Sequence, residues 1–190
     1  ITYMKDLEKD SYVVVLRNVI KELNKVRDDI HWTILSPKHV MSLQFENTEQ
    51  LMIDMPSYPN KMRTHFNADE ILKVIDWRNE DYDIVYSHLP EQTLALSNLF
   101  QNSTNLEPKI IGYSHWFEVK ENSNYDPTML AQNLLGVLEM EECGVNSIWL
   151  KDFVIEKSKE LLSDKQVNKL QDIIQPHYLG IDDVSPDHDY

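Results

Sequence analysis

Glycine and cysteine are both scarce in this chain of 190 residues, and each scarcity excludes a class of site. Four glycines are too few for the loops GxGxxG or GxxxxGK[ST], which cradle phosphates at the start of a helix. This argues against a Rossmann oxidoreductase and against a self-sufficient nucleotide-binding domain. The single cysteine, Cys143, excludes an internal disulfide framework and a cysteine-built zinc site. Its place beside Gly144 predicts a packing residue at the end of a helix.

Basic residues and long apolar runs are lacking as well. The formal net charge of −14 disfavours a nucleic-acid or anionic-membrane partner, because such partners are bound through Lys and Arg. No apolar run approaches the roughly 20 residues that cross a bilayer, and no secretory signal segment opens the chain. We therefore expect a cytoplasmic protein without a membrane span. No metal site is expected either.

What the sequence does contain is an alternation of short apolar segments with helical patterns. Such segments are typical of parallel strands that are covered on both faces. We therefore predict an α/β fold, a single Rossmann-like domain with a parallel sheet flanked by helices on both faces. The domain is expected over residues 1–183, and 184–190 is expected to be an acidic tail or the start of an interdomain linker. The predicted strands are 31–35, 51–55, 83–86, 109–113, 146–150 and an extended 174–178; the predicted helices are 7–26, 68–77, 91–100, 128–142, 152–162 and 167–173.

The tripeptide Tyr-Ser-His occurs twice, each time directly after a predicted strand. The copies are Tyr86-Ser-His88 and Tyr113-Ser-His115. Ligand sites of parallel sheets lie at the carboxyl ends of the strands, so both histidines are expected at one edge, facing one cleft. Histidine there can hydrogen-bond to sugar hydroxyls or move a proton near neutral pH. A single histidine of this kind more often fills a core gap; the repetition favours a site.

Four segments in order resemble the N-terminal domain of GT-B glycosyltransferases, in particular the retaining group related to glycogen synthases and mannosyltransferases. The family segment Asp-(Ile/Val)-(Ile/Val)…His is matched by 83–88, and the histidine-bearing loop of the next strand by 110–118. The segments 147–157 and 174–182 are similar to the strand–helix and interdomain segments that follow in the family. The resemblance spans residues 7 to 183.

This resemblance implies roles for several residues. His115 would hold the donor sugar, with Glu118 as a second catalytic residue and Ser114 and Trp116 as sugar contacts. His88 would lie deeper, in the acceptor cleft. The co-substrate would be a nucleotide sugar, with no other cofactor. The family's opening strand with its glycine-rich loop, and its C-terminal Rossmann-like half, would lie outside this chain, so activity is expected only together with that half.

The proline-punctuated loop 54–66 is a second candidate site. It contains Tyr58, Arg63 and His65. The aromatic rings could stack on the sugar ring of an acceptor, and the Arg63 guanidinium could bind a carboxylate or phosphate group through two hydrogen bonds. An ordinary surface loop explains the same residues equally well. By contrast, the carboxylates Glu139, Glu141 and Glu142 are expected on a solvated face, and His177 has no partner at ligand spacing.

The leading hypothesis is therefore a glycosyltransferase half that binds an unidentified acceptor and contacts the sugar of a nucleotide-sugar donor. Two alternatives remain open. One is a non-catalytic α/β binding module that keeps the cleft without chemistry. The other is half of a virus-encoded glycosyltransferase that modifies DNA bases, to which the net charge of −14 lends no support.

Overall fold

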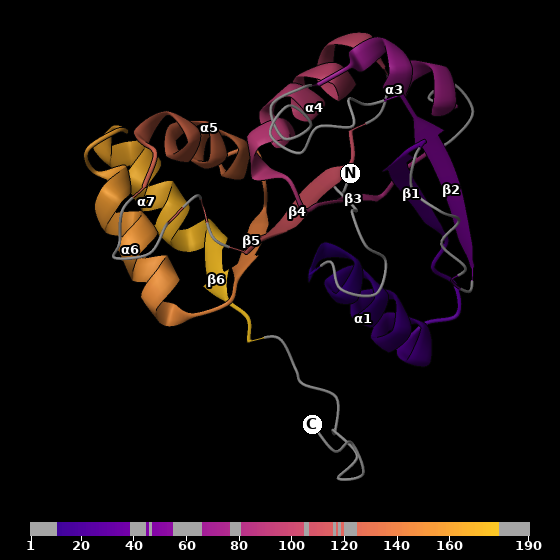
Figure 1. Ribbon diagram of the computed structural model, residues 1–190, viewed down its shortest axis with the longest axis horizontal. Helices are drawn as coiled ribbons and strands as arrows, with labels where there is room; N and C mark the ends of the chain where they lie inside the picture. The colour runs from indigo at the N-terminus through magenta and orange to yellow at the C-terminus, as the bar shows by residue number, and fades with distance from the viewer. Residues whose placement is uncertain are drawn as a thin grey trace, which may run out of the picture.

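Helices and parallel strands alternate along the chain in a computed structural model that describes residues 11–38, 45, 47–54, 66–76, 81–104, 107–115, 117, 119 and 125–178 (Figure 1). This confirms the predicted class, a single Rossmann-like α/β domain with parallel sheets flanked by helices. The tail at 184–190 lies outside the described residues. The helices are α1 (Ser11–Val26), α3 (Ala68–Val74), α4 (Pro90–Ser103), α5 (Pro127–Val137), α6 (Ile148–Ser158) and α7 (Asp164–Ile173). The strands are β1 (Trp32–Pro37), β2 (Thr48–Ile53), β3 (Ile84–Ser87), β4 (Lys109–Ser114), β5 (Glu142–Val145) and β6 (Ile174–Pro176).

The strands fall into two parallel sheets rather than the one that the sequence suggested. One sheet pairs β1 with β2, and the other has the order β3-β4-β5-β6. Two apolar clusters cover the two faces of β1, since Ile34 packs with α1 whereas Leu35 packs with α3 and α4. Figure 1 shows α1 on the opposite side of the strands from α3 and α4. The helices therefore flank the strands on both sides.

The larger core lies between the four-stranded sheet and helices α5, α6 and α7. Alternate residues of the strands enter it, among them Ile110, Cys143 and Ile174. Because side chains alternate along a strand, Tyr113 and Gly144 lie on the other face of the sheet. Val85 of β3 packs against this core and also against the cluster around α3 and α4. One residue thus contacts both apolar clusters.

The close approach of α5 to α4 requires glycine at position 136. A Cβ atom built on Gly136 would lie 1.7 Å from the carbonyl oxygen of Pro90, which is backbone and cannot swing away. Pro90 itself opens α4, where a missing N–H costs no hydrogen bond. The first turn of α4, directly after β3, is thereby fixed against α5.

The region around β5 corrects the sequence prediction. Residues 138–142 are not helical, since α5 ends at Val137, and 146–150 is not a strand. The strand is 142–145, so Cys143 packs in the sheet rather than at a helix end. Ser147 begins α6 because its hydroxyl accepts the N–H of Leu150, which satisfies a backbone donor of the first turn. No helix in the part of the chain that the structure describes is long and apolar enough to cross a membrane.

Candidate functional site

His88 and His115 lie together at the carboxyl ends of two neighbouring strands. His88 directly follows β3 and His115 directly follows β4, and the two strands are paired in parallel. Their rings stack with a centroid distance of 6.3 Å and an interplanar angle of 21°. The expected meeting of the two histidines at one sheet edge is therefore observed.

The tyrosine of each Tyr-Ser-His copy lies edge-on to the histidine of the same copy. The ring centroids are 4.7 Å apart for Tyr86 and His88 and 5.1 Å apart for Tyr113 and His115. Residues two apart in an extended chain point to the same side, which explains both contacts. The four rings form one row across β3 and β4, in which each histidine is held by a tyrosine and by the other histidine.

The two histidines differ in how much water they meet. His88 is only 3% exposed, and His115 is half-buried. Desolvation lowers the pKa of His88 to about 3, and the neighbouring His115 adds to the effect. At neutral pH His88 is therefore an uncharged imidazole behind His115. It can orient the ring of His115 by packing against it, but it is too buried to meet a bound hydroxyl group in this conformation and it cannot act as a cation.

The tyrosine hydroxyls remain protonated in the same environment. Burial raises the pKa of Tyr113 to about 12, and that of Tyr86 rises even further. The Tyr113 hydroxyl donates a hydrogen bond to the carbonyl oxygen of His177 at 3.1 Å. Tyr113 thereby connects the end of β4 with the residue after β6.

The serines of the two copies are buried, on the opposite side of the strands from the row of rings. The Ser87 hydroxyl pairs with that of Thr93 at 2.8 Å. Ser114 is 4% exposed, so its hydroxyl presents no surface to a donor sugar in this conformation. The other predicted site residues, Trp116, Glu118, Tyr58, Arg63 and His65, lie outside the described residues.

Sequence reasoning missed two polar groups that follow strands at the same edge, Asn146 after β5 and His177 after β6. The amide of Asn146, directly after β5, donates to the backbone carbonyl of His115 at 3.1 Å. His177 pairs with Glu142 at 2.7 Å, and both side chains remain about half exposed, in keeping with the solvated face expected for Glu142. The sequence prediction ended a helix at Glu142 and began the next strand at Asn146, so it placed no strand at β5. With β5 placed correctly, Asn146 would have been recognised as a third strand-end residue.

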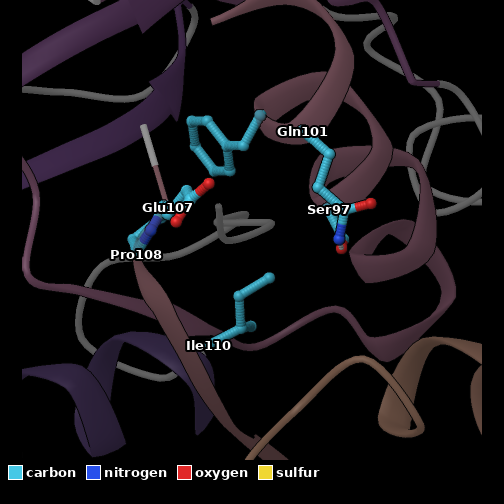
Figure 2. A pocket seen from close by; sticks show the side chains of 6 residues that line it. Ser97, Gln101, Glu107, Pro108 and Ile110 are labelled. Carbon is cyan, nitrogen blue, oxygen red and sulfur yellow. Dashed lines mark hydrogen bonds between the residues drawn. The ribbon is translucent and has the colours of Figure 1, made fainter. Parts of the chain in front are cut away.

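A surface hollow of about 350 Å³ lies elsewhere, and Figure 2 shows Ser97, Gln101, Glu107, Pro108 and Ile110 around it. Pro108 and Ile110 flank the first residue of β4, so the hollow lies at the amino end of that strand. The histidine pair lies at the opposite end. Among the described residues, no group of three or more His, Cys, Asp or Glu side chains could hold a metal ion.

Comparisons with known proteins find no match to this chain among family models, curated proteins or solved structures.

Proposed function

We propose that this domain is the acceptor-side half of a glycosyltransferase that uses a nucleotide-sugar donor. The observation that supports the proposal is the paired imidazoles of His88 and His115 at the carboxyl edge of a parallel sheet. Ligands of open α/β folds bind at this edge. Neutral imidazoles donate and accept hydrogen bonds, which suits the hydroxyl groups of a sugar.

In the proposed reaction, the bond between the anomeric carbon and the diphosphate oxygen of the donor breaks. A bond from that carbon to an acceptor hydroxyl oxygen forms, and the hydroxyl proton leaves to the departing phosphate or to water. His115 holds the hydroxyls of the transferring sugar, and His88 fixes the orientation of His115. This contribution is one of positioning and electrostatics. The diphosphate is bound by a second nucleotide-binding domain, because the four glycines of this chain make no phosphate loop.

The test is nucleoside-diphosphate release from UDP-glucose, ADP-glucose and GDP-mannose by the domain joined to its natural flanking sequence. His115→Ala should lower turnover on the accepted donor about 100-fold or more, as the loss of a hydrogen-bond donor at a reacting group does. The melting temperature should change little, because His115 is half-buried. The exposed His31→Ala is the matched control and should keep full turnover.

Two outcomes would contradict the proposal. One is the absence of turnover with any donor in the wild-type protein. The other is equal turnover in the wild-type protein and the His115→Ala variant.

The burial of His88 and Ser114 favours a second candidate, a binding module that keeps the fold without the chemistry. Such a module would bind a sugar ligand at the same edge, and binding would be lost in His115→Ala without any turnover in the wild-type protein. The same set of variants therefore distinguishes the two functions.

A further inference from the structure

Two large apolar side chains are exposed in the first turn of α6. Ile148 is 54% exposed and Trp149 is 57% exposed. Helix α6 begins just after the carboxyl end of β5, so this turn stands at the same sheet edge as the histidine pair. Single exposed apolar residues are common on protein surfaces, but a half-exposed indole beside a candidate site requires an explanation.

The indole of Trp149 is supported from behind by other rings. Phe153, one turn along α6, stacks on it at a centroid distance of 5.4 Å and an angle of 23°. Tyr125 meets Phe153 edge-on at 6.2 Å and donates its hydroxyl hydrogen to Glu160 at 2.9 Å. Lys157 lies 5.4 Å from the centre of the Tyr125 ring. Because one face of the indole lies against Phe153, the other face is a flat apolar surface held in place.

This surface stands at the same sheet edge as the histidine site, although the rings that support it pack on the side of α5, α6 and α7. Asn146 donates to the carbonyl oxygen of His115, and Trp149 follows Asn146 by three residues. Three residues of chain span at most about 11 Å. The rim is polar, since Asn146 and Asp152 are exposed and the Ser147 hydroxyl donates to the Asn146 side chain at 3.1 Å.

We propose that the outer face of Trp149 is the platform on which a pyranose ring of the acceptor stacks. The inference rests on the proposed function and names the substrate class of that site: an acceptor that is itself a glycoside. The face of a pyranose that carries C–H bonds packs on an aromatic ring, while its hydroxyls reach polar neighbours such as Asn146 and Asp152. A protein partner would need about 800 Å² of surface, far more than two exposed side chains provide.

The test is saturation-transfer NMR on the chain with methyl α-D-glucopyranoside and with maltose. Trp149→Ala should weaken binding of the better ligand about tenfold, as expected for the loss of one aromatic stacking contact. Trp149→Phe should restore most of it, because the flat ring returns. Ile148→Ala is the matched control: it removes an equally exposed apolar side chain from the same turn, and binding should be unchanged.

The platform is overturned if neither sugar binds the wild-type chain or if Trp149→Ala binds as the wild type does. Equal losses in Trp149→Ala and Ile148→Ala would also overturn it, because binding would then not depend on the flat ring. Failure of the proposed function has a different signature: sugar binding that depends on Trp149, with no nucleotide-sugar turnover. Turnover that depends on His115, with an acceptor KM unchanged in Trp149→Ala, would refute the platform alone.

Discussion

Lowering the pH from 7 to 5 should destabilise the fold through a single side chain, His88. Its imidazole is 3% exposed, and desolvation holds its pKa at about 3 in the folded chain. In the unfolded chain the pKa of a histidine is about 6.5. The folded value is the lower one, so the contribution of His88 to stability is fully present above about pH 6.5. It is lost progressively as the pH falls towards 3.

The magnitude follows from the difference in proton binding. Each pH unit between the two pKa values costs about 1.4 kcal/mol, so His88 alone costs about 2 kcal/mol between pH 7 and pH 5. For a domain of this size that corresponds to a fall in melting temperature of roughly 4–8 °C. The ion-paired carboxylates lose their contribution to folding stability only at lower pH. The hydrogen bond from Arg27 holds the pKa of Asp29 at about 2, so the contribution of Asp29 is lost only below about pH 4.

Urea unfolding of the wild-type protein and of His88→Phe at pH 7 and pH 5 measures this cost. Phenylalanine keeps the ring contacts with Tyr86 and His115 but cannot titrate, so the variant should lose about 2 kcal/mol less than the wild type over this range. The exposed His31→Gln is the matched control and should follow the wild type. A direct check needs no variant: the ring-proton NMR shift of His88 should stay constant from pH 7 to 5. Parallel pH dependences of the wild type and His88→Phe, or a His88 ring that titrates near pH 6, would refute the reasoning.

Two further predictions concern the helices that hold the site. Gly136→Ala should cost more than about 3 kcal/mol in urea unfolding, because its methyl group would overlap the Pro90 carbonyl, whereas Leu135→Ala, at a 37% exposed neighbour, should cost much less. An unchanged midpoint for Gly136→Ala would mean that α4 and α5 separate freely. Ser147→Ala should cost about 1 kcal/mol through loss of the α6 cap, and Ser147→Asp should restore it. Equal stability of the two Ser147 variants would show that the cap does not stabilise α6.

The fold class could be predicted from the sequence because most strands are short apolar runs between helical patterns. The exception is β5, whose four residues include Glu142 and Gly144 and carry little strand signal. The adjacent Ile148 and Trp149 suggested a buried strand instead, whereas they form the exposed first turn of a helix. Local pattern could not decide this, because the apolar side chains there face solvent.

The histidine pair could be predicted because parallel neighbouring strands bring their carboxyl ends together. The contacts of Asn146 with His115 and of His177 with Glu142 could not be predicted, since they depend on where β5 lies in the chain. The burial of His88 could not be predicted from the sequence either. It is set by tertiary packing around the strand end, and the same tripeptide leaves His115 half-buried.

Cys143 lies in β5 with none of its surface exposed, and burial raises the pKa of its thiol to about 12. A thiol reagent attacks the thiolate, so this sulfur reacts only when the strand separates from its neighbours. Because the chain has no other cysteine, a single alkylation rate reports the opening of β5. The alkylation rate of Cys143, measured by mass spectrometry, therefore gives the rate at which the sheet that carries the two histidines opens.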